Sequence, residues 1–216
     1  MKTYGQYCAV ARSLDLVGDR WVLLIVRELL SQGPCRFTDL RDGLPGIATN
    51  LLTARLKDME ENGLITRVDA PPPVATGLYQ LTERGLQLTP VIAALAEWGL
   101  PTMPAVTEGE AVRGNWLGLL GQLRLRDTGP APGPLTIAID AGETPVHLVS
   151  RDHTFEIRRG RPATADVRLS GEPRLIGGYL AGLLSLAEGR RLGLAAHGDE
   201  AAFRRLDITP PRETRP

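Results

Sequence analysis

Apolar residues in the first half of the chain follow a helical spacing that glycine and proline interrupt. Residues 21–31 (WVLLIVRELLS) predict a central helix that is apolar nearly all round. The Gly-Pro pair at 33–34 ends this helix, because proline cannot continue a helix and glycine suits the left-handed residue after one. Two further helices are predicted over residues 38–43 and 48–62, and the tight Leu-Pro-Gly turn between them indicates a helix-turn-helix.

The pattern then changes from helical spacing to strand-like alternation. Residues 64–69 (LITRVD) alternate, and a second alternating run resumes at residue 78 after the turn-rich segment APPPVATG, which predicts a hairpin with a stiff tip. An amphipathic helix is expected over residues 82–99, and residues 100–104 (LPTMP) are expected to form a linker. Because a hairpin directly follows the second helix of a helix-turn-helix, we expect a winged helix.

The C-terminal half predicts strands followed by helices. After a helix over residues 115–125, the runs LTIAIDAG, PVHLVS, TFEIRRG and ADVRLSG each have the length of a strand and are separated by turn residues. Residues 173–189 have helical spacing, and residues 200–206 are expected to close the chain as another helix. This order predicts an α+β domain in which helices cover one face of a sheet.

The composition is that of an ordinary globular chain. Of the 216 residues 43% are apolar and 23% are charged, with 25 basic and 25 acidic side chains. The half before residue 104 is close to neutral, so any binding of nucleic acid must come from a local arrangement of charge on one face. No run is long enough to span a bilayer and no secretory signal is visible, so we expect a cytoplasmic protein that contacts no membrane.

Polar and apolar side chains separate when residues 47–62, which include the helix predicted over residues 48–62, are projected on a helical wheel. At about 100° per residue the apolar residues gather on one side, and four polar residues gather on the other: Thr49, Asn50, Thr53 and Lys57. Hydroxyl, amide and ammonium groups bond base edges and phosphates when a helix lies in the major groove, although these four alone fit an ordinary solvated face equally well. Arg36 and Arg67 flank that face and favour DNA, as candidate phosphate contacts. Arg55 projects toward the apolar side, where we expect an ion pair with an acidic residue of a neighbouring helix.

Residues 4–99 resemble the HxlR-type winged-helix transcriptional regulators nearly end to end. The elements that carry the resemblance occur in order and at the right spacing: Cys8, Gly18-Asp19-Arg20-Trp21, Arg36-Phe37, Pro45-Gly46-Ile47, Leu52-Thr53-x-Arg55-Leu56 and Leu81-Thr82-x-x-Gly85. The resemblance implies a homodimer that binds palindromic operators in double-stranded DNA. One departure is Ala48, where the family often has a serine that caps the recognition helix; Thr49 and Asn50 are candidates for that role.

The resemblance also implies dimerisation through the N-terminal segment and the helix that ends at Gly99. An apolar stripe on that helix agrees with this: Val91, Ile92, Leu95 and Trp98. The alternative is that the stripe packs on the C-terminal domain.

Cys8 matches a cysteine that acts as a thiol redox sensor in some members of the family. Arg12 is the only cation nearby to activate it, so a buried structural cysteine is the favoured interpretation and redox sensing the alternative. Cys35 lies close to the expected DNA face, and if it is exposed its oxidation would weaken DNA binding.

The second half is similar, less closely, to the sterol carrier protein type of domain. The elements that carry this similarity are Arg159-Gly160, Asp166-Val-Arg-Leu-Ser-Gly, Ala181-Gly182 and Gly198-Asp199-x-x-Ala-x-x-x-Leu, with His197 where the family has an acidic residue. The similarity implies an apolar tunnel between the sheet and its helices. Six residues would line it: Trp116, Leu120, Ile137, Ile139, Leu180 and Leu184. The same residues would fill a solid core equally well.

Enzyme chemistry finds little support, because the sequence contains no P-loop, no dinucleotide fingerprint, no nucleophile elbow and no metal-ligand spacing. We therefore expect no catalysis, no cofactor and no metal. The expected organisation is a winged helix over residues 1–100, a linker over 101–112 and a sterol carrier-like α+β domain over 113–216. We expect a dimeric DNA-binding regulator that a hydrophobic small molecule modulates through the C-terminal domain. The alternative is a small-molecule or lipid carrier that uses its winged helix to dimerise.

Overall fold

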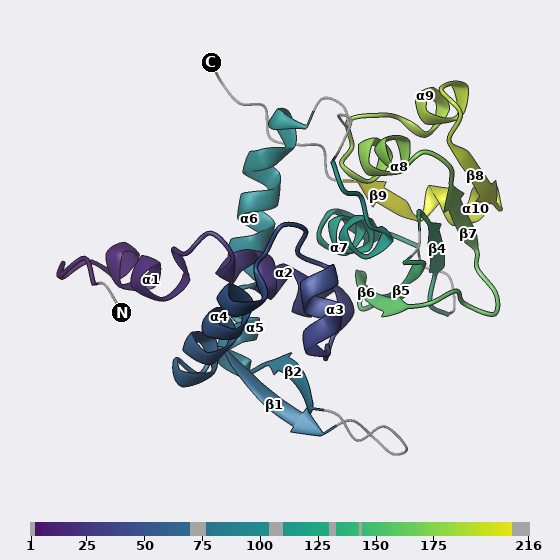
Figure 1. The fold of residues 1–216 in the computed structure, drawn as a ribbon. Coiled ribbons are helices and arrows are strands. Elements are labelled where there is room, and N and C mark those ends of the chain that lie inside the picture. Colours follow the sequence, from purple (N-terminus) through teal and green to yellow (C-terminus); the bar gives the residue numbers. More distant parts are fainter. Residues whose placement is uncertain (1–2, 70–76, 104–109, 130–132, 143, 209–216) are drawn as a thin grey trace. The chain divides into compact units, whose positions relative to one another are not determined.

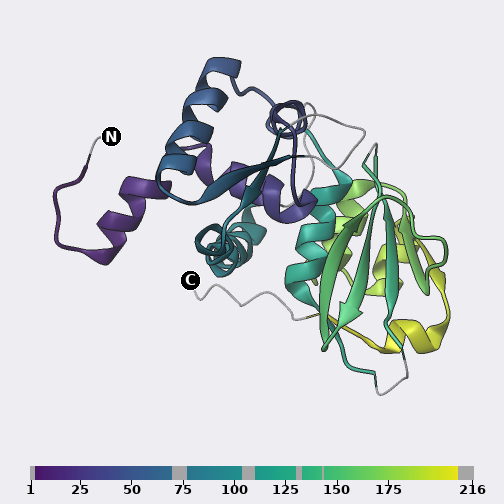
Figure 2. The ribbon, with the colours of Figure 1, turned by 90° about the horizontal axis from the view of Figure 1, so that it is seen from below.

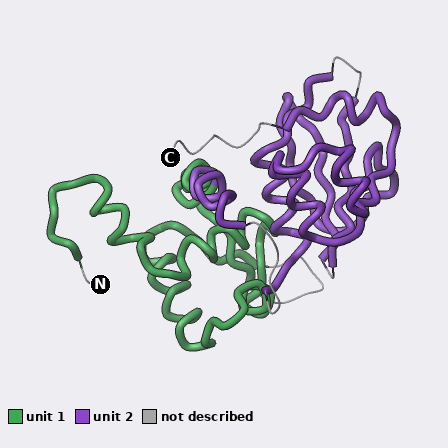
Figure 3. The backbone as a smooth tube through the Cα atoms, turned by 90° about the horizontal axis from the view of Figure 1, so that it is seen from above, with its two compact units in different colours: residues 1–92 green, residues 93–216 purple. Residues whose placement is uncertain are grey.

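The computed structural model describes residues 3–69, 77–103, 110–129, 133–142 and 144–208 (Figure 1). The chain divides into two compact units, residues 1–92 and residues 93–216 (Figure 3). Each unit has its own buried core.

The first unit is a winged helix. Its helix-turn-helix consists of α3 (Phe37–Asp42) and α4 (Thr49–Glu61), and its wing is the antiparallel pair of β1 (Ile65–Asp69) and β2 (Gly77–Leu81). The unit also contains α1 (Ala9–Val17), α2 (Val22–Gln32), α5 (Glu83–Leu86) and the first residues of α6 (Thr89–Gly99). The core forms where the apolar sides of α2, α3 and α4 are buried, at Ile25, Val26, Leu40, Leu52, Leu56 and Met59. The tip of the predicted hairpin, residues 70–76, lies outside the described residues.

The helix expected over residues 82–99 is two helices, α5 and α6 (Thr89–Gly99). The cause is Pro90, because proline has no N–H and its ring clashes with the carbonyl four residues earlier, whereas it is tolerated in the first turn of a helix. Residues 100–104 were expected to form a linker, but Leu100–Thr102 form a short 3-10 helix, η1, and Leu100 is buried.

The second unit is built on a five-stranded mixed sheet with the order β6-β5-β4-β7-β8 (Figure 2). Its strands are β4 (Thr136–Asp140), β5 (Val146–Arg151), β6 (Thr154–Arg159), β7 (Val167–Ser170) and β8 (Ala195–Gly198). Within this sheet β4 and β7 run parallel, and the other neighbouring strands run antiparallel. A separate antiparallel pair joins β3 (Leu125–Asp127) to β9 (Leu206–Ile208).

Helices pack on the apolar face of this sheet, as predicted. They are α7 (Gly114–Arg124), α8 (Pro173–Leu180), α9 (Leu186–Arg191) and α10 (Glu200–Arg204). Gly118 and Gly121 let α7 lie close to the strands, since a Cβ at Gly118 would lie 2.5 Å from the Ile157 side chain and one at Gly121 would lie 2.7 Å from Leu148. At these two positions side chains, and not open space, fill the gap between helix and sheet.

The predicted helix over residues 173–189 is interrupted after Leu180. Gly182 adopts a positive φ of 73°, and Ser185 begins α9 with a capping box in which its hydroxyl accepts from the Glu188 N–H. β3 and β9 were not predicted because each has only three residues and closely follows a helix, and β8 was not predicted because Ala-Ala-His-Gly does not alternate between apolar and polar residues.

Candidate functional site

The polar face of α4 is exposed. Leu52, Leu56 and Met59 are buried on one side of the helix, and the four predicted contact residues are exposed on the other: Thr49, Asn50, Thr53 and Lys57. We call these four the α4 polar face. The prediction that Thr49 or Asn50 caps the helix is confirmed in part. Ala48 occupies the N-cap, but Asn50 Oδ1 accepts from the Leu51 N–H at 2.9 Å and so satisfies one of the first N–H groups of the helix. The Thr49 carbonyl accepts from the Thr53 hydroxyl at 2.9 Å.

Two cations at this face each contact a carboxylate of the same helix. Lys57 Nζ lies 3.7 Å from Glu61 Oε1, and Arg67 Nε, on the wing, lies 3.5 Å from Glu60 Oε2. The Arg67 guanidinium also lies 5.0 Å from the centre of the Tyr79 ring. Ion pairs this exposed contribute little stability, so both cations are available to another anion.

The start of α3 is fixed to the wing. The Cys35 N–H donates to the Tyr79 carbonyl at 2.9 Å, and the Tyr79 N–H donates back to the Cys35 carbonyl at 2.8 Å. Arg36, the next residue, is exposed at the N-cap of α3, where its backbone N–H donates to the Asp39 carboxylate at 3.1 Å. The bridge therefore keeps Arg36 and the wing at a fixed spacing.

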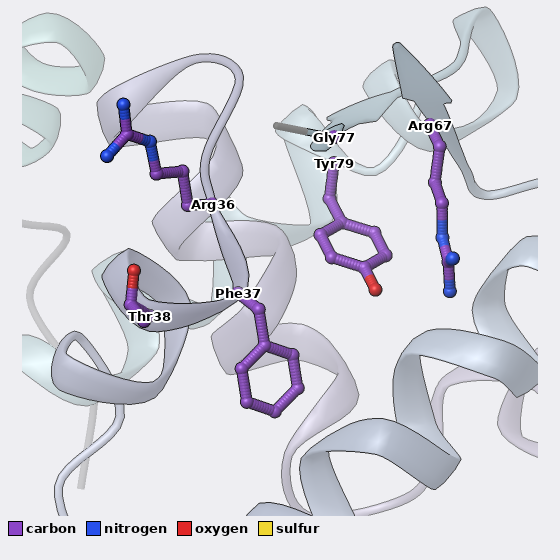
Figure 4. Close-up of a pocket in the computed structure, with 6 residues that line it drawn as sticks. All are labelled: Arg36, Phe37, Thr38, Arg67, Gly77 and Tyr79. Carbon is purple, nitrogen blue, oxygen red and sulfur yellow. The ribbon is translucent and has the colours of Figure 1, made fainter. Parts of the chain in front are cut away.

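A cavity of about 450 Å³ lies between the start of α3 and the wing (Figure 4). Its lining residues are Arg36, Phe37, Thr38, Arg67, Gly77 and Tyr79. The sequence pointed to Arg36 and Arg67 but missed the two aromatic residues. The predicted hairpin could have indicated Tyr79, because this residue pairs directly with Arg67 in the observed register.

Arg27, which bonds a buried carboxylate of its own helix, clamps α2 to the end of α3. Glu28 is fully buried and accepts from Arg27 Nη2 at 2.7 Å and from Gln32 Nε2 at 2.6 Å, while Arg27 also donates to the Gly43 carbonyl at 3.2 Å. A Cβ at Gly43 would collide with the Glu28 carboxylate, so a larger residue in the turn after α3 would have to displace that carboxylate. Sequence reasoning did not identify this clamp.

Arg55 forms ion pairs, as predicted, but neither partner lies on a neighbouring helix. Its guanidinium donates to Asp58 at 2.8 Å and lies 3.5 Å from Asp19. Asp19 belongs to the turn between α1 and α2, and not to a helix as expected.

The favoured interpretation of Cys8 is wrong, and the exposure on which the Cys35 prediction depended is not observed. Cys8 is exposed at the start of α1, whereas a buried structural role was favoured. Cys35 is fully buried and its Sγ donates to the Gly33 carbonyl, so it is not the exposed thiol that oxidation at the DNA face would need.

Two helices expose large apolar side chains. On α6 these are Val91, Leu95 and Trp98, the last with 76% of its surface exposed. On α1 they are Val10 and Leu14, and Tyr7 just before the helix is fully exposed. Ile92 is the exception to the predicted stripe, because it is buried.

The six candidate lining residues of the C-terminal unit gather around its core. Ile137, Ile139 and Leu180 are fully buried in the main apolar cluster, Leu120 and Leu184 pack against it, and Trp116 is half-buried on α7. His147 has a partner, since its Nδ1 lies 2.9 Å from the Gly160 carbonyl. Over the described ranges, no three His, Cys, Asp or Glu side chains come together as a metal site. None of the helices described is long and apolar enough to cross a membrane.

Comparison with known proteins agrees with the winged helix. The sequence profile of the HxlR-like helix-turn-helix family matches residues 16–106. An HTH-type transcriptional regulator of Synechocystis is 38% identical over 98 residues, which are 44% of this chain and 70% of that protein. One of Mycobacterium bovis is 36% identical over 135 residues, 62% of this chain and 78% of that protein.

The solved structure of the reduced transcriptional regulator YodB from Bacillus subtilis is 30% identical, covers 47% of this chain and 100% of that chain, and has a TM-score of 0.40. The relatives of Synechocystis and Mycobacterium are matched over most of their length and exceed 30% identity. This chain therefore belongs to the HxlR-like helix-turn-helix family of transcriptional regulators.

Proposed function

We propose that the protein is a homodimeric regulator that binds a specific DNA sequence by inserting α4 into the major groove. The observation that carries the proposal is the α4 polar face, which is exposed over its whole length while the opposite side of the helix is buried. Thr49, Asn50 and Thr53 offer donors and acceptors to base edges, and Lys57 offers a charge to a phosphate. Arg36 and Arg67 would contact the backbone on either side of the groove.

The proposed dimer uses the exposed apolar side chains of α1 and α6. Large apolar side chains grouped on the surface of a monomer commonly mark an interface. A twofold dimer would place two copies of α4 against two half-sites about 34 to 36 Å apart, one turn of DNA, or farther. A carrier that used the winged helix only to dimerise would show no preference for any DNA sequence, which separates the two hypotheses.

Lys57→Ala and Asn50→Ala are expected to weaken DNA binding in different ways. Loss of the lysine removes about one phosphate contact, so affinity falls for every sequence and the slope of log affinity against log salt flattens by about one. Loss of the amide leaves one base unread, so specific binding weakens by about 1–3 kcal/mol while non-specific binding stays the same. Fluorescence anisotropy titrations with specific and scrambled duplexes at several salt concentrations measure both effects.

Arg204→Ala is the matched control, because Arg204 is an exposed cation paired four residues along its helix with Glu200, as Lys57 is with Glu61. Unchanged binding in both Lys57→Ala and Asn50→Ala would refute the groove assignment.

Glu61→Gln and Glu60→Gln are each expected to raise DNA affinity roughly two- to fivefold at low salt. Each change removes a negative charge beside the DNA and releases a cation, Lys57 or Arg67, that the carboxylate contacts in the free protein. The gain should be equal for specific and scrambled duplexes and should shrink as salt rises. Glu200→Gln, which breaks the equivalent pair on α10, should change nothing; an equal gain there would mean that only net charge matters.

We further propose that the C-terminal unit is a sterol carrier-like domain that binds a hydrophobic small molecule and thereby alters DNA binding. Support comes from the mixed five-stranded sheet with helices on its apolar face and from the sequence elements shared with that domain type. Trp116, Leu120, Ile137, Ile139, Leu180 and Leu184 would contact the molecule. A ligand that changes the spacing of the two recognition helices by a few ångströms would prevent the dimer from binding both DNA half-sites at the same time.

A further inference from the structure

The cavity beside the α4 polar face has the size of a small-molecule site. Its volume of about 450 Å³ falls within the range of roughly 300–1,000 Å³ that such sites occupy. It is formed entirely within the winged-helix unit, and none of its lining residues belongs to α4, which carries the proposed base contacts.

Two aromatic rings from different elements form its walls. Phe37 comes from the first turn of α3 and Tyr79 from β2, and both are half-buried. The paired backbone hydrogen bonds between Cys35 and Tyr79 hold the two elements together, and Cys35 itself is fully buried. The walls are therefore in place before any ligand arrives, which lowers the entropic cost of binding.

Positive charge lies at the rim. Arg67 stacks over the Tyr79 ring, and Phe37, Tyr79 and Arg67 extend in the same direction in Figure 4, while Arg36 extends away from them. The pair between Arg67 and Glu60 is exposed and 3.5 Å long, so an incoming carboxylate that bonds both guanidinium edges would displace Glu60.

Gly77 leaves the cavity open at the wing. Side chains alternate along a strand, so position 77 shares the face of the hairpin that carries Tyr79, and the register places Asp69 opposite it. A Cβ at Gly77 would meet nothing within 4 Å. Asp69 is not among the lining residues, and a large side chain at position 77 would occupy the space that glycine leaves.

We infer that this cavity binds a small planar aromatic carboxylate. Its ring would lie against Phe37 and Tyr79 and its carboxylate would bond the Arg67 guanidinium. Because Arg36 and Arg67 are also the proposed contacts to the DNA backbone, the bound anion would compete with DNA. That consequence rests on the proposed function, whereas binding of the anion does not.

Isothermal titration of the full chain with 2-naphthoate tests the site directly. Saturable binding is expected, and it should be about tenfold weaker for 2-naphthamide, which has the same ring without the charge, and for cyclohexanecarboxylate, which has the charge without the aromatic ring. No saturable binding of 2-naphthoate up to about 10 mM would overturn the proposal.

Variants locate the binding. Arg67→Gln should abolish the preference for naphthoate over naphthamide, and Gly77→Leu should abolish binding of both, with circular dichroism confirming that each variant is folded. Phe37→Leu tests the aromatic wall a second time and should weaken the binding of 2-naphthoate and 2-naphthamide about equally. Arg204→Gln, a change of an exposed arginine in the other unit, should bind as the unchanged protein does. Binding that survives both Gly77→Leu and Arg67→Gln would place the ligand elsewhere and overturn the assignment.

Competition is measured by DNA titration in the presence of 2-naphthoate. At ten times its dissociation constant, the ligand should raise the apparent Kd for DNA about elevenfold for each site that must be emptied, and Gly77→Leu should remove this sensitivity. Naphthoate that binds in the cavity and leaves DNA affinity unchanged would overturn the competition but not the site. A protein that binds no DNA would refute the proposed function, and the calorimetry would still decide the site.

Discussion

Trp98→Asp is expected to convert the protein into monomers and to weaken binding to an operator with two half-sites by about a hundredfold or more. Val91, Leu95 and Trp98 recur at spacings of four and three residues, so they lie along one side of α6, and all three are exposed. In a dimer that buries this side, aspartate would lose its hydration without gaining a partner. The exposed position of Trp98 in the single chain means that the substitution should leave the monomer folded.

Native mass spectrometry measures the subunit count, and a titration with one and two half-sites measures the loss of paired binding. Leu183→Asp is the matched control, because Leu183 is another exposed leucine, between α8 and α9, that the proposed interface does not include. A Trp98→Asp protein that remains dimeric would refute the interface. The same spectra report any hydrophobic compound that is retained on purification, which would support the proposed role of the C-terminal unit.

Asp127→Asn is expected to lower the free energy of unfolding at neutral pH by about 3–5 kcal/mol. Asp127 ends β3 and receives two bonds from Arg205, from Nε at 3.0 Å and from Nη2 at 2.7 Å, and both side chains are largely buried. The substitution would leave the arginine buried opposite a neutral amide, with the whole of its partner's charge and one of the two acceptor oxygens removed. Because Arg205 lies just before β9, the ion pair also holds β9 against β3.

The effect should depend on pH. Burial raises the pKa of Asp127, but hydrogen bonds from Arg205, Ser150 and the Gly129 N–H outweigh burial and lower the pKa to about 2. A carboxyl whose pKa is lower in the folded state stabilises the fold above its unfolded pKa of about 3.8, and this contribution disappears as pH falls through about 2. Urea unfolding at pH 7 and near pH 2 should therefore show a large gap between the two proteins that narrows in acid.

Asp207→Asn is the control for this prediction, since Asp207 is exposed on β9, the same strand pair. It should change stability little at either pH. Equal stability of Asp127→Asn and the unchanged protein at pH 7, or a gap that persists near pH 2, would contradict the assigned role.

Local signals in the sequence were sufficient for the helix-turn-helix and the wing, because glycine and proline mark their ends and the spacing of apolar residues marks their faces. They were insufficient where distant residues meet. The cavity depends on a bridge between Cys35 and Tyr79, and the Asp127–Arg205 pair joins positions 78 residues apart. Neither contact produces a periodic sequence pattern from which it could be predicted.

Burial of single residues was the least predictable property. Free cysteine is usually buried, yet Cys8 precedes a helix that leaves several apolar side chains exposed, so its surroundings differ from those of a typical cysteine. Pro90, by contrast, did carry a local signal for the break between α5 and α6, which the continuous apolar spacing on either side concealed.

The separation of the two sides of α4 has a consequence for how such a protein can diverge. Thr49, Asn50, Thr53 and Lys57 are exposed, and the core is formed by other residues of the same helix. Substitutions at exposed positions without special contacts usually change stability by less than about 0.5 kcal/mol. Duplicated copies of the gene could therefore acquire different residues at these four positions and bind new target sequences. Selection against destabilising substitutions at Leu52, Leu56 and Gly43 would keep the scaffold unchanged.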